Sequence, residues 1–301
     1  MKALPACLPQ DPVFIVGYPR SGTTLLQRLL VAQPGFHSLP ETHYFTVIER
    51  RLQLGENDRI AVSDIGALSE AIAEKMDVQL TAQEIGQLTE TAQRSELTSK
   101  MAFEFIVSRF LAAQIEAGGA ASWRWVEKTP THANFLERIL QVYPLAQVLH
   151  IIRHPVPAIL SRRRKFPFNR ETPLERLAWA WNRLLDNAEL SRERHPRQVH
   201  ALRYEDLVGD MEITLRAVGA FLHAPSLMAR AASIRWQELP AAPVLEHETW
   251  KLQDMNAALA NTNETYRQTA GAGDVETIEA IVGARMARFG YGHFSCEPSA
   301  E

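Results

Sequence analysis

The sequence contains very little cysteine. Its 301 residues include only two, Cys7 and Cys296, which stand near opposite ends of the chain. Two such distant thiols form no disulfide framework, and they lack the paired spacing of a structural zinc site. We therefore expect a cytoplasmic protein that uses no metal ion.

Long apolar runs and a strong excess of one charge are also absent. The N-terminal stretch MKALPACLPQDPVFIVG is interrupted by three prolines, unlike a signal peptide, and no apolar segment is long enough to cross a membrane. With 32 basic and 35 acidic residues, the formal net charge of −3 creates no general attraction for nucleic acid or anionic lipid. We expect no nucleic-acid partner and no membrane insertion, so any basic site must be local.

The rest of the composition is typical of one large α/β domain. Apolar residues make up 46% of the chain, and no internal repeat or low-complexity tract divides it. Short apolar runs at 13–16 and 147–152, with a weaker candidate at 198–203, alternate with amphipathic helical patterns. Strands separated by helices predict a central, mostly parallel sheet covered by helices. We expect a single domain over 1–301.

Several helices are well marked. The stretch TPLERLAWAWNRLLDNAEL predicts a helix with Thr172 as its N-cap and Glu175 completing a capping box. Its apolar stripe, which includes Trp179 and Trp181, is typical of core packing. Residues 60–117 are mostly helical in pattern, and the closing IEAIVGARMARFGYG predicts a packing helix.

An anion site is predicted directly after the first apolar run. In FIVGYPRSGTTLLQRLL, residues 14–30, the spacing from Gly17 to Gly22 matches the Walker phosphate loop, but Thr23 stands where that pattern requires lysine. A glycine-containing turn between a strand and a helix directs several backbone N–H groups, and the positive end of the helix, toward one concavity. The loop is therefore predicted to bind a phosphate-like group, but the missing lysine distinguishes it from the loop of an ATPase.

The polar residues of this loop carry a family resemblance. The string YPRSGTT resembles the 5′-phosphosulfate loop of the sulfotransferases that use 3′-phosphoadenosine 5′-phosphosulfate (PAPS). The resemblance implies a P-loop NTPase-like three-layer fold in which Arg20, Ser21, Gly22, Thr23 and Thr24 hold the 5′-phosphosulfate. In that family the basic residue lies within the loop, as Arg20 does, which accounts for the missing Walker lysine.

A second pair of residues matches the same family. The sequence RHPVPAILSRRRKF places Arg153 at the end of a predicted strand and Ser161 eight residues later. The resemblance implies that both grip the 3′-phosphate, the group that distinguishes PAPS from ATP. The family's usual Arg-Asp-Pro is Arg-His-Pro here, and His154 is a departure that leaves the phosphate contacts intact. The basic run 162–165 is either solvated helix surface or an added attraction for PAPS or an acidic acceptor.

Further segments resemble the family less closely. The stretch RYEDL is similar to a strand-to-helix element of the family, which implies that Tyr204 contributes to the nucleotide pocket. Residues 50–120 form a helical insertion that we expect on the acceptor side. No Arg-Lys-Gly phosphate motif is evident near the C-terminus, and we expect Trp250 and Lys251, within 240–275, to form a lid.

Three candidates for the general base follow the loop helix, in AQPGFHSLPETHYF. The separation of Glu41 from Arg20 in the loop is similar to that in the tyrosylprotein sulfotransferases. This resemblance implies that Glu41 removes the acceptor's proton. His43 is the alternative, since cytosolic-type sulfotransferases use histidine and an extended segment would place both side chains on one face. His37 is a weaker candidate.

A lysine completes the predicted chemistry. In WVEKTPTHANFLERI, Lys128 stands between a possible short strand and a helix. A positive charge at a helix start is unfavourable unless an anion faces it. The Lys-Thr-Pro string is similar to that of bacterial and tyrosylprotein sulfotransferases, which implies that Lys128 faces the sulfuryl group or the bridging oxygen. Glu127 and His132 receive no role from the sequence.

The resemblance implies that PAPS donates a sulfuryl group to a hydroxyl or amine acceptor and leaves as PAP, with Glu41, Lys128 and Arg20 as the catalytic residues and no metal. Two alternatives remain. One is a P-loop kinase or NTPase, which the missing lysine and the absence of an evident metal-binding acid disfavour. The other is a non-catalytic nucleotide-binding protein. The acceptor class stays open between a small alcohol or phenol, a carbohydrate, a lipid and a peptide tyrosine, and the sequence is compatible with a homo-oligomer.

Overall fold

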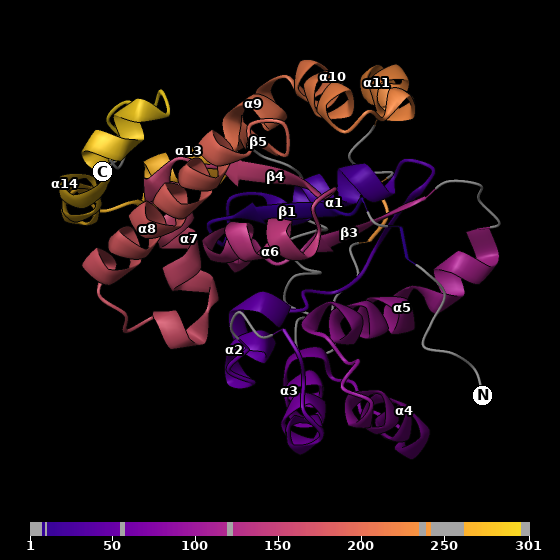
Figure 1. Cartoon of the computed structure of the whole chain (residues 1–301). Coiled ribbons are helices and arrows are strands. Elements are labelled where there is room, and N and C mark those ends of the chain that lie inside the picture. Colours follow the sequence, from indigo (N-terminus) through magenta and orange to yellow (C-terminus); the bar gives the residue numbers. More distant parts are fainter. Residues whose placement is uncertain are drawn as a thin grey trace.

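A parallel sheet runs through the centre of the protein (Figure 1). Its strands are β1 (Val13–Gly17), β2 (Phe36–Ser38), β3 (Arg124–Lys128), β4 (Gln147–Ile152) and β5 (Val199–Arg203). All neighbours pair in parallel, in the order β2-β3-β1-β4-β5. The structure is a computed structural model that describes residues 8–9, 11–54, 58–118, 123–234, 239–241 and 262–295. The predicted α/β fold with a parallel sheet is confirmed.

Helices connect the strands and cover the sheet. The longer ones are α1 (Thr23–Val31), α3 (Ile65–Met76), α4 (Ala82–Gln93), α5 (Ser99–Gly118), α6 (Leu136–Val142), α7 (Pro155–Lys165), α8 (Leu174–Arg194), α10 (Met211–Phe221), α13 (Thr262–Thr269) and α14 (Ala272–Arg288). Shorter helices and helical turns are η1 (Tyr44–Ile48), α2 (Glu49–Arg51), η2 (Val62–Asp64), η3 (Pro130–Phe135), η4 (Pro167–Asn169), α9 (Tyr204–Gly209), α11 (Pro225–Arg230) and η5 (Ala231–Ser233). No helix in the described ranges combines the length and the apolar character needed to cross a membrane.

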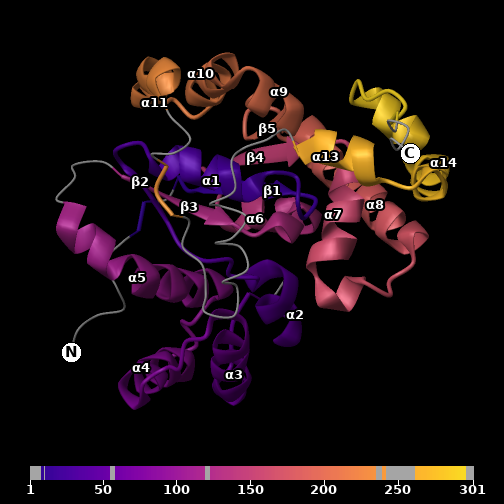
Figure 2. The same ribbon diagram turned by 180° about the vertical axis from the view of Figure 1, so that it is seen from behind.

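Both faces of the sheet are buried, which explains why its central strands are continuous apolar runs. In β1, Phe14 and Val16 pack into a core shared with α3, α5, α6, α8 and α14. Val13 and Ile15 point the other way, into a core shared with α1, α10 and α11. Figures 1 and 2 show the resulting layers, with α9 to α11 on one side of the sheet and α3 to α5 on the other.

The parallel arrangement gathers the predicted site residues at one edge of the sheet. Because every strand runs in the same direction, the segments that follow the strands share the edge where ligands bind in α/β proteins. Each strand contributes one of the predicted residues: Arg20 follows β1, Glu41 follows β2, Lys128 ends β3, Arg153 follows β4 and Tyr204 follows β5. Residues that are 184 positions apart in the sequence are thus brought to one edge of the fold.

Two local predictions around α8 are wrong. The helix begins at Leu174 with Pro173 as its N-cap and no capping hydrogen bond from a side chain, so the predicted capping box does not form. The hydroxyl of Thr172 instead donates to the carbonyl oxygen of Phe168, 3.3 Å away. Trp179 is 60% exposed although Trp181 is buried. Residues two positions apart point to different sides of a helix, so one apolar stripe could not bury both.

Other helical predictions are confirmed. The region predicted at 60–117 forms α3, α4 and α5, and their apolar residues join the core beside β1. The C-terminal pattern forms α14, which packs against α7 and α8, while α13 packs against α7 (Figure 2). This packing brings residues from the end of the chain to the edge of the sheet that carries the predicted site.

Candidate active site

The loop between β1 and α1 has the backbone of an anion-binding turn. The N–H of Ser21 donates to the carbonyl oxygen of Tyr18 at 3.1 Å, and both Arg20 and Gly22 have left-handed backbones, with φ of 75° and 96°. A Cβ atom at Gly22 would lie 2.6 Å from Cδ2 of the Tyr204 ring. Glycine is therefore required here both for its backbone conformation and for the close approach of Tyr204.

One hydroxyl of the loop lacks a partner. Ser21 is 0% exposed, and its Oγ atom has no hydrogen-bond partner among the described residues. A buried hydroxyl without a hydrogen bond costs about 1–3 kcal/mol, so this loop is suited to an additional acceptor such as an anionic oxygen. Thr23, also buried, and the partly buried Thr24 begin α1, where the helix dipole favours an anion.

Arg20, Arg153 and Ser161 lie together. The Nε atom of Arg20 donates to the Ser161 hydroxyl at 3.1 Å, and Nη1 of Arg153 donates to the Arg20 carbonyl oxygen at 2.9 Å. The structure thus joins the loop after β1 with the end of β4 and with α7. The residues predicted to bind the 5′-phosphosulfate and those predicted to bind the 3′-phosphate therefore form one connected cluster.

Arg153 is held in a buried setting. Its side chain is almost completely covered, its guanidinium lies 4.6 Å from the centroid of the Tyr204 ring, and its Nε donates to Oδ1 of Asn263 at 2.8 Å. Burial lowers the pKa of Arg153, although Tyr204 and Glu205 partly oppose that shift. A phosphate group beside this desolvated cation would gain a stronger interaction than it would at an exposed arginine.

Glu205 organises the surroundings of Arg153, and the sequence did not assign it to the site. Its Oε1 atom accepts hydrogen bonds from the His154 backbone N–H at 3.0 Å and from Nδ2 of Asn263 at 2.8 Å. Its Oε2 atom accepts one from the Tyr291 hydroxyl at 2.7 Å. Asn263 and Tyr291 were not predicted because they reach the site from the C-terminal part of the chain, without a local motif.

His154 replaces the aspartate of the family pattern without loss of the helix cap. Its Nδ1 atom accepts a hydrogen bond from the Val156 backbone N–H at 3.3 Å, which is the contact expected of an N-cap side chain. Its Nε2 atom lies 3.1 Å from the Gly292 carbonyl oxygen and therefore carries the proton. Burial lowers the pKa of His154, which favours this neutral form.

Glu41, Lys128 and His43 form a second cluster. Glu41 and Lys128 are buried and make an ion pair, while Oε2 of Glu41 lies 3.5 Å from Nε2 of the more exposed His43. The segment is not extended as supposed, since His43 has a left-handed backbone with φ of 50°. The two candidate bases nevertheless lie side by side. His37 instead packs its ring against Trp123, with 5.6 Å between centroids.

The segment that carries Glu41 is tied to the loop helix. In α1, Nε2 of Gln27 donates to the Ser38 hydroxyl at 2.6 Å and to the Leu39 carbonyl oxygen at 3.2 Å. The Ser38 hydroxyl in turn donates to the carbonyl oxygen of Val126 in β3, at 2.8 Å. These bonds fix the position of the chain two residues before Glu41 relative to both the anion loop and β3.

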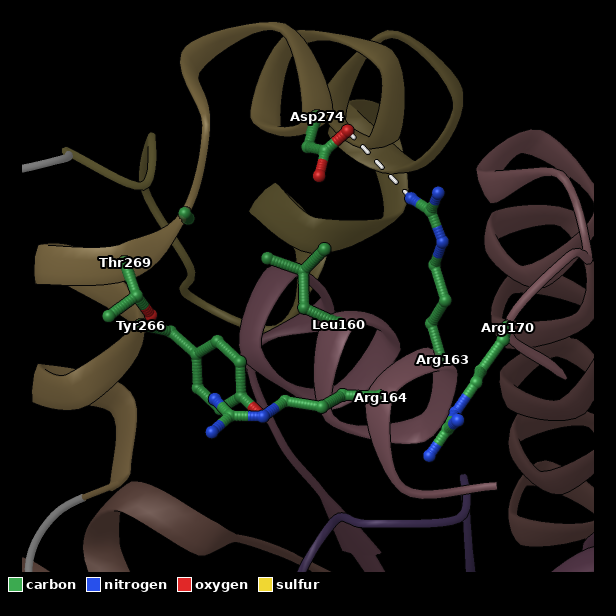
Figure 3. A pocket seen from close by; sticks show the side chains of 8 residues that line it. Leu160, Arg163, Arg164, Arg170, Tyr266, Thr269 and Asp274 are labelled. Atoms are coloured by element: carbon green, nitrogen blue, oxygen red, sulfur yellow. Dashed lines mark ion pairs between the residues drawn. The ribbon is translucent and has the colours of Figure 1, made fainter. Parts of the chain in front are cut away.

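A cavity of about 510 Å³ lies between α7 and the segment that carries α13 and the start of α14, and its walls include part of the basic run (Figure 3). Arg163 reaches Asp274 at 3.8 Å, Arg164 extends toward Tyr266, and Arg170 points in another direction. Because the three guanidinium groups diverge, a single small anion would not contact them all in this arrangement. Among the described residues, no group of three or more His, Cys, Asp and Glu side chains could hold a metal ion.

The lid prediction falls mostly outside the structure. Trp250 and Lys251 lie outside the described residues. The described end of the 240–275 segment includes α13, whose Asn263 contacts Arg153. The C-terminal part of the chain therefore does reach the predicted 3′-phosphate residues, through a side chain that the sequence did not single out.

Comparisons with known proteins agree with the fold. A sulfotransferase domain from the curacin biosynthetic pathway is 20% identical and has a TM-score of 0.52, over 95% of this chain and 99% of its own. A sulfotransferase from Mycobacterium avium is 16% identical with a TM-score of 0.53, over 95% of this chain and 79% of its own. At these identities the likeness concerns the fold, which sulfotransferases share with P-loop NTPases. No curated protein matches the sequence.

A family model provides the more specific result. The model described as the sulfotransferase family matches residues 12–227, which include the loop after β1, the Lys-Thr-Pro string, Arg153, Ser161 and Tyr204. The match covers most of the chain and all five strands. This protein belongs to the sulfotransferase family.

Proposed function

We propose that this protein transfers a sulfuryl group from PAPS to a hydroxyl or amine group of an acceptor and releases PAP. The observation that supports it most directly is the cluster of Arg20, Ser161 and Arg153, in which the anion loop and the arginine after β4 are in contact. A nucleotide with a phosphate on both its 5′ and 3′ sides suits two adjoining anion sites. The unpartnered hydroxyl of Ser21 adds a donor on the 5′ side.

The proposed chemistry uses groups already present at the edge of the sheet. Glu41 accepts the proton of the acceptor's hydroxyl as its oxygen attacks sulfur, and the bond between sulfur and the bridging phosphate oxygen breaks. Arg20, Lys128 and the backbone N–H groups of the loop stabilise the negative charge that develops on the departing phosphate. Their fixed positions supply this stabilisation without a reorganisation cost during the reaction.

The ion pair between Glu41 and Lys128 is consistent with these roles. A carboxylate beside an ammonium group is stabilised in its ionised form, which is the form that a general base needs. Phosphosulfate oxygens near Lys128 would compete for the ammonium group and leave the Glu41 carboxylate available to the acceptor. His43, next to the same carboxylate, remains the alternative base.

Two measurements test the proposal. Calorimetry should show that the protein binds PAP more tightly than ADP, because only PAP carries a 3′-phosphate for Arg153 and Ser161. Mass spectrometry of reactions that contain PAPS and pooled alcohols, phenols, carbohydrates, lipids and peptides should reveal an acceptor that gains the mass of one SO₃ group. Equal affinities for PAP and ADP would contradict the 3′-phosphate site. Tight PAP binding without transfer to any acceptor class would favour a non-catalytic nucleotide-binding protein.

A further inference from the structure

A buried carboxylate connects the two segments that carry Glu41 and Lys128. Glu127 lies in β3, one residue before Lys128, and its side chain is 0% exposed. An ionised carboxylate can be buried in this way only if hydrogen bonds replace its water shell. Its partners therefore indicate what the residue holds in place.

Five donors surround this carboxylate. Its Oε1 atom accepts from the backbone N–H and the hydroxyl of Thr42, at 3.3 and 2.8 Å, and from the hydroxyl of Thr129 at 2.6 Å. Its Oε2 atom accepts from the Thr129 backbone N–H at 3.1 Å and from Nδ1 of His132 at 2.9 Å. Burial on its own raises the pKa of Glu127, but His132 and the two hydroxyls more than offset this effect and lower it.

The positions of the donors matter more than their number. Thr42 directly follows Glu41, and Thr129 directly follows Lys128, so one carboxylate binds the backbone next to each member of the ion pair. The Thr129 hydroxyl also accepts a hydrogen bond from the His43 backbone N–H at 3.3 Å. The segment after β2 is consequently bound to the end of β3 at both Thr42 and His43.

The donors are themselves rigidly placed. Thr42, Thr129 and His132 are each 0% exposed, and the His132 ring packs against the ring of Phe45 with 5.3 Å between centroids. A carboxylate held from three buried residues has little freedom to shift. A displacement of about 1 Å in a reacting group can cost a hundredfold in rate, so a fixed anchor at this point bears directly on catalysis.

We propose that Glu127 is a positioning residue. By anchoring Thr42 and Thr129, it fixes the positions of the Glu41 carboxylate and the Lys128 ammonium group relative to each other. This inference rests on the proposed function, since it takes Glu41 as the base. Glu127 itself touches neither the acceptor nor the nucleotide in this proposal. Its effect on the reaction therefore passes through Glu41 and Lys128.

A double-mutant cycle separates this role from a general contribution to folding. Glu127→Gln replaces one carboxylate oxygen by an amide donor, which cannot accept from the surrounding donors, so at least one anchor is lost. In the wild-type background we expect kcat to fall by about ten- to a hundredfold, with the Kd for PAP changed by less than about twofold. In a Glu41→Gln background the same change should cost less than about threefold, because the base through which Glu127 acts is already absent.

Two further variants keep the test independent of whether Glu127→Gln folds. Thr42→Val and Thr129→Val each remove one hydroxyl at nearly constant size, and each should lower kcat in the wild-type background but not in the Glu41→Gln background. Glu49→Gln is the matched control: Glu49 is also a buried glutamate and accepts bonds from Ser99 and Arg138. It should lower the melting temperature and leave kcat unchanged.

The outcomes distinguish the two proposals. Equal losses from Glu127→Gln in both backgrounds, or full activity of all three variants in the presence of Glu41, would overturn the positioning role while leaving the proposed function intact. A fully active Glu41→Gln enzyme would instead overturn Glu41 as the base, and with it this role of Glu127.

Discussion

The Nε atom of Arg20 donates a hydrogen bond to the hydroxyl of Ser161, 3.1 Å away, and so links the loop after β1 to helix α7. These residues are 141 positions apart in the sequence. Arg153 reaches the same loop from the end of β4, where it donates to the Arg20 carbonyl oxygen. The residues proposed for the two phosphates are thus hydrogen-bonded to one another. A substitution at one phosphate site is therefore expected to have a smaller effect on the other site as well.

Replacement of Arg153 by alanine should weaken the binding of PAP far more than that of ADP. Removal of one member of a buried charge pair costs about 2 kcal/mol or more, which corresponds to at least about thirtyfold in Kd. ADP lacks the 3′-phosphate and should lose only the smaller effect transmitted through the Arg20 carbonyl contact. Isothermal calorimetry with both nucleotides measures the difference. Equal losses for PAP and ADP would contradict the assignment of Arg153.

Ser161→Ala provides a milder version of the same test. The variant removes a hydroxyl but no charge, so the expected loss for PAP is about 1 kcal/mol, or roughly fivefold. It also removes the acceptor of the Arg20 hydrogen bond, and ADP binding should therefore fall slightly as well. A loss for ADP as large as that for PAP would place Ser161 on the 5′ side of the nucleotide rather than the 3′ side.

Substitution of the proposed base should separate binding from turnover. Glu41→Gln removes the proton acceptor while keeping the size of the side chain, so kcat should fall by at least about a hundredfold with the affinity for PAP nearly unchanged. His43→Gln is the comparison, because its ring lies next to the same carboxylate. We expect a loss of less than about tenfold for His43→Gln. The reverse order of the two losses would assign the base to His43.

The framework of the fold was accessible from the sequence because it depends on local patterns. β1 and β4 are covered on both faces and therefore appear as continuous apolar runs. β2 was missed because it has only three residues, Phe36–Ser38, and owes its strand conformation to pairing with β3. Trp179 was misplaced because an apolar residue on a helix gives no indication of whether its own side of the helix is covered.

The site was accessible in part, for a similar reason. Motifs identified residues that stand next to strand ends, such as Arg20 and Arg153, and the parallel sheet then gathered them. Asn263 contacts Arg153, and Tyr291 contacts the neighbouring Glu205, only through tertiary packing of the C-terminal part of the chain. The sequence assigned no role to Glu127, because that role depends on which residues hydrogen-bond to its buried side chain. The spacing of residues along the sequence does not identify these hydrogen-bond partners.

Gly22→Ala should damage the anion loop. The left-handed backbone, with φ of 96°, is strained for alanine, and the new Cβ would meet the Tyr204 ring at 2.6 Å. We expect a destabilisation of more than about 1 kcal/mol together with weaker binding of PAP. Gly86→Ala is the control, because Gly86 lies within α4 and the added Cβ would meet no atom within 4 Å apart from its chain neighbours and the backbone of its own helix, so alanine there should stabilise slightly. Urea denaturation measures both changes, and similar effects at the two positions would contradict the special requirement at Gly22.

Acid should destabilise the protein through His150, a residue of β4. His150 is 0% exposed, and its two ring nitrogens have no hydrogen-bond partner among the described residues. Burial lowers its pKa to about 4 from 6.5, with a smaller upward effect of Glu189 and a downward one of Arg192. Because the folded state binds the proton less readily than the unfolded chain, the stability is complete above pH 6.5 and declines as the pH falls toward 4.

The size of this acid effect can be isolated by substitution. A shift of this size corresponds to a loss on the order of 3 kcal/mol across the interval, at 1.36 kcal/mol per pKa unit. His150→Leu removes the titrating group, so its free energy of unfolding should depend less on pH between 7.5 and 4.5 than that of the wild type. The difference between the two proteins cancels other titrating groups, including His154 and His200, whose pKa values are also lowered by burial. Parallel pH dependences of the two proteins in urea denaturation would show that His150 takes up no proton on unfolding, contrary to this prediction.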